Sequence, residues 1–463
     1  MTIAHNDADL TALEPAIERI WELATEFGLE PFPTHFEVVP ASIMYEIGSY
    51  GMPGRFAHWS HGKSYHLQKT MYDYGMSKIY ELVINTDPCW AFLLDSNSLL
   101  EHQFVVAHVL GHSDFFRNNA YFRKTSRRML ETIKLNANRV RDYEYKYGVK
   151  EVERTLDAVL SIQEHVAPWE SCDLQGQSSA NASRGSVYDD LWELDDRDAE
   201  PVPEPARSAV GRCRTPMHDL LLFLTAESPS LEDWQRDIVQ IVRGEMLYFY
   251  PQMQTKIINE GWASYWHVQI LRALELPTSD HIEFAKLHSG VVQPHRHRLN
   301  PYFLGFSILN DIERRYDEEG GPGAGREQLF RIRETECDVS LVRNHLTKEL
   351  VEDLDLYFAE REGDEFVVTE KDWEGVRDRL VDQLVDFGIP SITAEDADYN
   401  GNRELFLKHQ WTGQPLDPNW ARKTLEGVQQ LWGRTVWLET RRDDKAVTLR
   451  YSAADGHSEE SDA

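Results

Sequence analysis

The stretch that decides the fold is FVVAHVLGHSDFFRNN, residues 104–119. Its apolar residues are nearly continuous, which is typical of a buried helix. His108 and His112 are four residues apart, so on a helix they lie on one face and can bind a single metal ion through their imidazole nitrogens. The alternative is a pair of core histidines that hydrogen-bond to carbonyl or carboxylate oxygens.

A second stretch, INEGWASYWH at residues 258–267, combines polar and aromatic residues in the same way. Glu260, Ser264 and His267 stand at i, i+4 and i+7, so they form one polar stripe on an otherwise apolar helix. An apolar helix does not bury a carboxylate and an imidazole unless they are paired or bind a ligand. The two stretches together therefore favour a ligand site over two isolated core histidines.

Both stretches resemble helices of the aminopeptidase N-type gluzincins. Residues 105–112, VVAHVLGH, resemble the VxAHExxH helix of that family, and residues 259–265, NEGWASY, resemble its NEGFASY helix. The resemblance implies that His108, His112 and Glu260 are the ligands of a zinc ion. Two features depart from the family: the stretches are much farther apart in sequence, and Val109 replaces the glutamate that acts as general base on water.

Two further residues are candidates for catalysis. His267 would orient a metal ligand or act as acid or base in place of the missing glutamate. Tyr302 follows Asn300-Pro301, which favours a turn and then a helix start, and its phenol would stabilise an oxyanion. The alternative for Tyr302 is a buried phenol with one hydrogen-bond partner.

Other polar residues give weaker signals. His58 and His61 lie in a loop rich in glycine, proline and aromatic residues, where they form either a second metal pair or a cap on the core edge. The four cysteines, Cys89, Cys172, Cys213 and Cys337, contain no CxxC pair and are expected to be reduced thiols. Cys89 or Cys213 as a nucleophile is a third option, but neither has a base beside it in the sequence.

The composition narrows the classes of function and location. Asp and Glu number 78 against 48 Lys and Arg, a net charge of −30, and Arg outnumbers Lys among the basic residues. Such a surface suits a halophile, because salt screens self-repulsion. The charge argues against nucleic acid as a partner, and the basic residues 295–298 are too few to form a binding stripe. The chain shows no leader-like start and no membrane-length apolar run, so we expect a cytoplasmic protein without a membrane partner.

The order of elements predicts an α+β fold with two domains. Residues 1–319 are expected to form a large, mostly helical, zincin-like domain with a short sheet from strands at 82–86 and 89–94, interrupted by a mobile acidic insert at 171–207. A Gly-rich linker at 320–326 would lead to a small α+β domain at 327–452. Residues 453–463 are expected to be an acidic tail that packs on nothing.

The order of motifs along nearly the whole chain resembles the stage V sporulation protein R (SpoVR) family. The motifs are the loop EIGSYGMPGRF from Glu46, HVxGHxDFFxNN, NEGWASYWH, NPYxLG and LxLKH at 405–409. The insert at 171–207 departs from the family pattern. Family membership implies no defined activity, although relatives are often encoded near a serine protein kinase.

Two hypotheses about function follow. The first is a zinc-dependent enzyme, a hydrolase or transferase acting on the amide bond of a protein or peptide substrate. The second is a non-catalytic regulator that binds a partner in a kinase-linked stress or sporulation complex.

Overall fold

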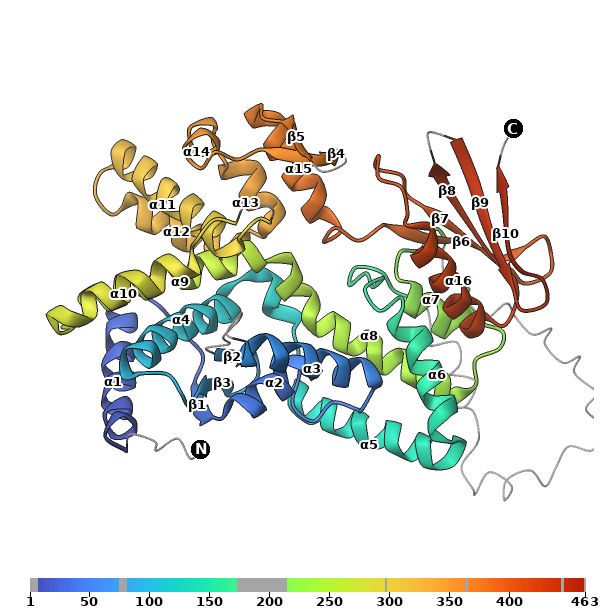
Figure 1. Cartoon of the computed structure of the whole chain (residues 1–463), viewed down its shortest axis with the longest axis horizontal. Coiled ribbons are helices and arrows are strands. Elements are labelled where there is room, and N and C mark those ends of the chain that lie inside the picture. Colours follow the sequence, from blue (N-terminus) through green and yellow to red (C-terminus); the bar gives the residue numbers. More distant parts are fainter. Residues whose placement is uncertain are drawn as a thin grey trace, which may run out of the picture. The chain divides into compact units, whose positions relative to one another are not determined.

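The computed structural model describes residues 7–74, 81–172, 215–295, 298–362, 365–442 and 445–461 (Figure 1). The fold is α+β, as predicted, with helices predominating. The chain divides into two compact units, each made of two segments. Unit 1 comprises Met1–Arg139 and Tyr248–Gly388, and unit 2 comprises Val140–Leu247 and Ile389–Ala463.

A three-stranded sheet in unit 1 has the order β1-β3-β2. Its central strand β3, Cys89–Leu94, is almost entirely buried, pairs in parallel with β1, Thr34–Val39, and pairs antiparallel with β2, Glu81–Ile84. The central strand is apolar at nearly every position because both of its faces are covered. The predicted strands before the histidine helix are therefore confirmed.

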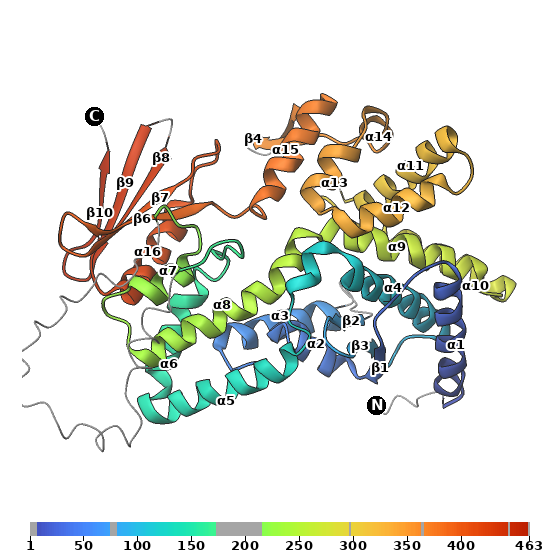
Figure 2. The same cartoon turned by 180° about the vertical axis from the view of Figure 1, so that it is seen from behind.

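The centre of unit 1 is a set of helices in mutual contact (Figures 1 and 2). Helix α4, Leu99–Asn118, packs against α1, Asp7–Glu26, and against α9, Lys256–Ala273. Helix α9 packs in turn against α11, Pro301–Gly320, which contacts α12, Ala324–Thr335. The remaining helices of this part are α2 (Ala41–Tyr50), α3 (Trp59–Asp73), η1 (Ala120–Lys124) and α10 (Thr278–Val291).

Small residues let α4, α9 and α11 approach closely. A Cβ added to Gly111 of α4 would lie 2.7 Å from Cα of Ala263 on α9, and one added to Gly261 would lie 2.4 Å from the carbonyl carbon of Gly305 on α11. These distances are far below van der Waals contact, so the helix backbones touch at these points. The same contacts bring the polar residues of the three helices to one region.

The rest of unit 1 follows α12 in sequence. It contains α13 (Asp338–His345), α14 (Lys348–Asp353), the hairpin β4 (Phe358–Glu362) with β5 (Glu365–Glu370), and α15 (Trp373–Val385). The expected domain boundaries do not coincide with the observed units. Residues 320–326 comprise the end of α11, a three-residue connection and the start of α12. The two helices pack against each other within unit 1, and residues 327–388 belong to the same unit.

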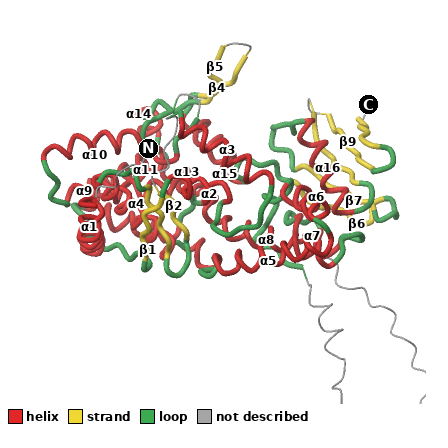
Figure 3. Tube along the Cα trace, turned by 60° about the horizontal axis from the view of Figure 1, so that its bottom comes forward, coloured by secondary structure: helices red, strands yellow, loops and turns green. Residues whose placement is uncertain are grey.

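Unit 2 contains a five-stranded sheet of order β10-β9-β8-β7-β6. All five strands are labelled in Figure 1, and strands are yellow in Figure 3. Its strands are β6 (Ile392–Tyr399), β7 (Glu404–His409), β8 (Val436–Arg442), β9 (Lys445–Ser452) and β10 (Gly456–Ser461). Helix α16, Pro418–Trp432, crosses over between β7 and β8, which pair in parallel. The other helices of this unit are α6 (Val149–Leu160) and α7 (Leu220–Glu227), while α5 (Met129–Tyr147) and α8 (Asp233–Gln254) contain the unit boundaries.

Two expectations about the C-terminus and the cysteines need correction. The tail predicted to pack on nothing forms β10, which pairs antiparallel with β9 from Gly456↔Ser452 to Ser461↔Val447. Cys89 and Cys337 are free and buried, but Cys172 is disulfide-bonded rather than reduced. Cys213 and residues 173–207 of the acidic insert lie outside the described residues. No helix in the described part of the chain is long and apolar enough to cross a bilayer.

Candidate metal centre

Helix α4 carries the first two candidate ligands. It begins at a capping box, in which Ser98 accepts from the Glu101 N–H and the Glu101 carboxylate accepts from the Ser98 N–H. His108 and His112 are both buried, at 3% and 8% exposure. Their ring centroids are 4.6 Å apart and the rings are nearly perpendicular, so the two imidazoles lie on one face as the spacing predicts.

Helix α9 brings Glu260 to the same point. Its Oε2 lies 3.6 Å from His108 Nε2 and 3.3 Å from His112 Nε2, and the three ligand atoms are within 4.8 Å of one another. A tetrahedral ion with bonds of about 2.1 Å places neighbouring ligand atoms roughly 3.4 Å apart. The three side chains therefore have the spacing of a metal site, and they are the one such group among the described residues.

The polar atoms at the centre of this group lack ordinary hydrogen-bond partners. His108 Nε2 and Glu260 Oε2 are both buried without one. Buried polar atoms are nearly always hydrogen-bonded, and leaving one unsatisfied costs about 1–3 kcal/mol. Burial alone would raise the pKa of Glu260, but the charge of His112 and the contacts with both imidazoles lower it below its usual range. An anionic carboxylate facing two imidazole nitrogens fits a cation.

A side chain from α13 holds the first turn of α9 in place. Asp338 accepts hydrogen bonds from the backbone N–H groups of Ile257 and Ile258, at 2.8 and 2.9 Å. These donors have no partner within the helix, and the N-cap residue Thr255 makes no side-chain cap. The carboxylate therefore supplies the missing cap one turn before Glu260 and fixes the start of the helix that carries it.

Asn259 orients His112. Its Oδ1 lies 2.9 Å from His112 Nδ1, so the ring donates its Nδ1–H to the amide oxygen. Burial opposes protonation of this ring, but the charge of Glu260 raises the pKa of His112 above its usual value. When the ring is neutral, as a metal ligand must be, its lone pair is at Nε2, the atom that faces Glu260. Metal-binding histidines commonly donate their other N–H in this way, which fixes the tautomer and the ring plane.

His108 is held by a chain of two further imidazoles. Its Nδ1 lies 3.0 Å from His267 Nδ1, and His267 Nε2 lies 2.9 Å from Nδ1 of His288 on α10. Burial, followed by the charges of His108 and His288, lowers the pKa of His267 well below its usual value. Burial also lowers the pKa of His288 to about 4. Two neutral rings therefore relay a hydrogen bond from His108 Nδ1–H, and its Nε2 is free to bind a cation.

Tyr302 lies beside the three ligands at the start of α11. The side chain of Asn300 accepts from the Tyr302 N–H and caps this helix, with Pro301 at its first position, so the predicted helix start is confirmed. The Tyr302 ring stacks on His108 at a centroid distance of 5.9 Å. Burial, and next the negative charge of Glu260, raises the pKa of Tyr302, so its hydroxyl keeps its proton.

A cavity of about 680 Å³ opens onto this cluster. His108 and Tyr302 form part of its wall, so a molecule in the cavity could contact the candidate site. The rest of the wall combines apolar and charged groups, which suits a ligand with both kinds of surface. The other lining residues are Glu81, Glu101, Phe104, Glu283, Lys286, Leu287, Gly290 and Val291.

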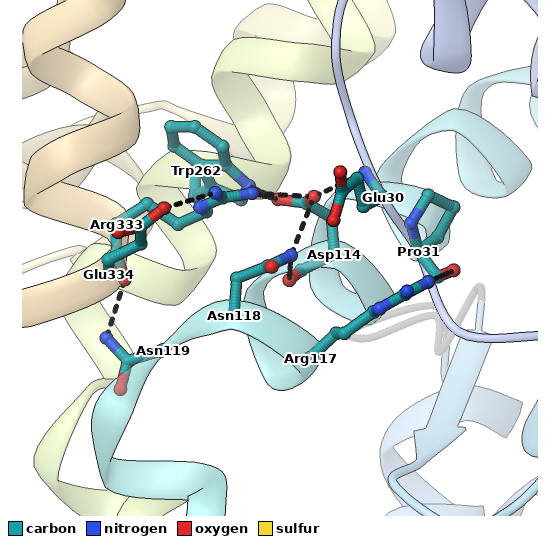
Figure 4. A network of polar contacts seen from close by, with 9 residues as sticks. All are labelled: Glu30, Pro31, Asp114, Arg117, Asn118, Asn119, Trp262, Arg333 and Glu334. Atoms are coloured by element: carbon teal, nitrogen blue, oxygen red, sulfur yellow. Dashed lines mark hydrogen bonds and ion pairs between the residues drawn. The ribbon is translucent and has the colours of Figure 1, made fainter.

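The second half of the α4 motif serves a different purpose (Figure 4). Asp114 is fully buried, and both of its oxygens accept from Arg333 on α12, at 2.8 and 3.0 Å. Oδ2 also accepts from the Trp262 indole N–H at 3.0 Å, and Oδ1 accepts from the Glu30 backbone N–H at 2.7 Å. Asn119 donates to the backbone oxygen of Arg333. These residues tie α4 to α9 and α12.

His58 and His61 do not form a second metal group in the described structure. His58 is the N-cap of α3, its Nδ1 contacts the Ser60 hydroxyl at 2.7 Å, and the two rings are 5.8 Å apart. His61 is buried, with Nε2 3.4 Å from Arg55. The structure thus places this pair at the core edge.

The structure brings all five predicted site residues together, and it adds three that the sequence did not indicate. Asn259 directly precedes Glu260, so its place in the NEGWASY stretch was a usable signal. No sequence signal pointed to His288 or Glu81, because no sequence spacing relates them to the ligand helices. Their positions depend on how α10 and β2 pack.

Comparison with known proteins places the chain in a family. The family model for SpoVR like protein matches residues 7–389, and that for the SpoVR-like C-terminal domain matches residues 390–443. The protein is also 30% identical over 489 aligned positions to the uncharacterized protein YcgB of Escherichia coli strain K12, covering 94% of this chain and 93% of that protein. No solved structure matches the chain. The protein therefore belongs to the SpoVR family.

Proposed function

We propose that this protein is a zinc-dependent hydrolase of amide or peptide bonds. The observation that carries the proposal is the convergence of His108, His112 and Glu260, with two buried polar atoms aimed at a common point. Two imidazoles and one carboxylate are the ligand set of catalytic zinc sites that leave a fourth position open. The cavity beside His108 would admit the substrate.

Each residue of the cluster has a role in this proposal. His108, His112 and Glu260 would hold the ion, while Asn259 and His267 would orient the two imidazoles through their Nδ1 atoms. A bound zinc ion would supply Lewis acidity toward a carbonyl oxygen or a water molecule. Tyr302, which keeps its proton, would donate a hydrogen bond to the carbonyl oxygen as negative charge develops there.

Metal content tests the proposal directly. We expect close to one equivalent of zinc in the purified full chain by elemental analysis, and almost none in His112→Ala. The matched control is His345→Ala, which removes a half-buried histidine of the same unit that lies outside the cluster. Native protein without stoichiometric metal would overturn the proposal, and so would metal retained in His112→Ala.

Turnover tests the second part of the proposal. The zinc-loaded protein should cleave members of a peptide library, and Glu260→Gln should abolish the cleavage together with metal binding. If the metal-loaded protein cleaves no peptide, the metal site is supported and the hydrolase function is not.

A second candidate function is a non-catalytic regulator that binds a partner in a kinase-linked stress or sporulation complex. One observation favours it: Val109, where gluzincins carry their base, is completely buried and offers no proton acceptor. A stable stoichiometric partner together with no turnover of the peptide library would support this function over hydrolysis.

A further inference from the structure

In gluzincins a glutamate on this helix acts as the general base, and Val109 occupies its position here. Helix α4 has no free carboxylate that could take over this role. Its two acidic residues near the site are already engaged: Asp114 is bound by Arg333, and Glu101 closes the capping box with Ser98. Glu260 faces the two imidazoles. A hydrolase at this site therefore needs a proton acceptor from another element.

Glu81 lies in the position to provide one. It is the first residue of β2, where it pairs with Leu93 of the central strand β3, so its backbone is fixed by the sheet. Its side chain lines the same cavity as His108 and Tyr302. The carboxyl group of Glu81 and the candidate ligand His108 therefore share the wall of one cavity.

Glu81 is nevertheless separate from the ligand group. The ligand atoms that lie within 4.8 Å of one another are those of His108, His112 and Glu260 alone among the described residues. A carboxylate on the wall of the same cavity, but outside the ligand group, would leave room for a water molecule between itself and a bound ion. General bases in metal-dependent hydrolases act on water from such a position.

We propose that Glu81 is the general base of this site and replaces the glutamate that α4 lacks. This inference rests on the proposed hydrolase function. Glu81 would take a proton from a water molecule while the water oxygen forms a bond to the carbonyl carbon of the substrate. The C–N bond would then break, and the proton held by Glu81 would pass to the departing amine nitrogen. Water is consumed, and an acid and an amine are released.

The test uses Glu81→Gln, which keeps the size of the side chain and removes its charge. Glu37→Gln is the matched control, because Glu37 is an exposed carboxylate on strand β1 of the same sheet and is not among the residues that line this cavity. Each full-length protein is loaded with cobalt, whose absorption spectrum reports the binding of azide to the metal, and with zinc for peptide cleavage. Metal content is measured in all samples.

We expect Glu81→Gln to keep full metal content, to lose about 10²- to 10⁴-fold in cleavage rate, and to bind azide about tenfold more tightly. The azide effect follows because a negative charge that repels the anion is removed. Glu37→Gln should change both quantities less than threefold. Unchanged azide affinity or unchanged cleavage in Glu81→Gln would overturn the inference, and lost metal would identify Glu81 as a ligand instead.

The azide measurement separates this inference from the proposed function. If the wild-type protein cleaves no peptide but Glu81→Gln still binds azide more tightly, the hydrolase proposal fails, while the position of Glu81 beside the metal is supported. If neither protein binds cobalt, the metal site and the inference fail together.

Discussion

The two ends of one motif on α4 bury polar groups in opposite ways. At the C-terminal end, both oxygens of Asp114 accept hydrogen bonds, and Arg333 supplies the opposite charge. Nearer the middle of the helix, His108 Nε2 is buried without a hydrogen-bond partner, and so is Oε2 of Glu260, which faces it from α9. A buried carboxylate that is fully hydrogen-bonded stabilises the fold, whereas an imidazole nitrogen and a carboxylate oxygen left open beside each other form a candidate site for a cation. The comparison separates the structural half of the motif from the half that carries the candidate metal site.

Removal of Arg333 should have the largest effect on stability. Arg333→Ala leaves the fully buried Asp114 carboxylate without its charged partner, and breaking such a pair costs roughly 3–5 kcal/mol. The free energy of unfolding from urea denaturation measures the loss. The control is Arg331→Ala on the same helix, whose ion pair with Glu327 is exposed and should contribute less than about 1 kcal/mol. Equal losses in the two variants would contradict the structural role of Asp114.

Metal should stabilise the other end of the motif. Zinc at about 100 times its dissociation constant should raise the free energy of unfolding of the wild-type protein by about 2.7 kcal/mol, because it binds only the folded state. His112→Ala should show no such gain. Without metal, His112→Ala should be less destabilised than Arg333→Ala. If, without metal, His112→Ala loses more free energy of unfolding than Arg333→Ala, the triad is part of the structural core.

The close contact between α9 and α11 should affect both the free energy of unfolding and the affinity for zinc. Gly261→Ala adds a Cβ that would lie 2.4 Å from the backbone of Gly305, so α9 and α11 must separate, and overpacking of this kind typically costs about 1–3 kcal/mol. Because Glu260 is the adjacent residue, zinc affinity should fall as well, which competition with a chelator measures. Gly244→Ala on α8 is the control, since its Cβ would meet no atom within 4 Å. Wild-type zinc affinity in Gly261→Ala would contradict the proposed link.

The smallest effect should come from Asn259, which supports a ligand without touching the ion. Asn259→Ala removes the acceptor for His112 Nδ1–H, and losses of this kind lower metal affinity about 10- to 100-fold. Asn419→Ala, at an exposed position in unit 2, is the control. Competition with a chelator again gives the affinity. An unaltered zinc affinity in Asn259→Ala would show that His112 needs no orienting partner.

Local structure was largely predictable because it depends on short-range spacing. The i, i+4 pair on α4, the helix start at Asn300-Pro301-Tyr302, and the strands before α4 follow from side-chain periodicity and capping chemistry. The tail was predicted wrongly because an acidic composition indicates exposure, whereas β10 gains its place through backbone hydrogen bonds to β9. Domain boundaries read from glycine content differed from the observed units, since contacts between segments far apart in sequence define each unit.

The sequence by itself determined that two histidines share one helix face. It also determined that a carboxylate and an imidazole lie on a second apolar helix. Both follow from helix geometry, because residues three and four positions apart lie on the same face. Only the tertiary structure decided that these faces meet through Gly111, Gly261 and Gly305, and that Asp114 is tied to Arg333 while the triad is left open. It also decided that His288 contacts His267 and that Glu81 lines the same cavity as His108. The physical reason is that close backbone packing, rather than sequence spacing, sets distances between elements.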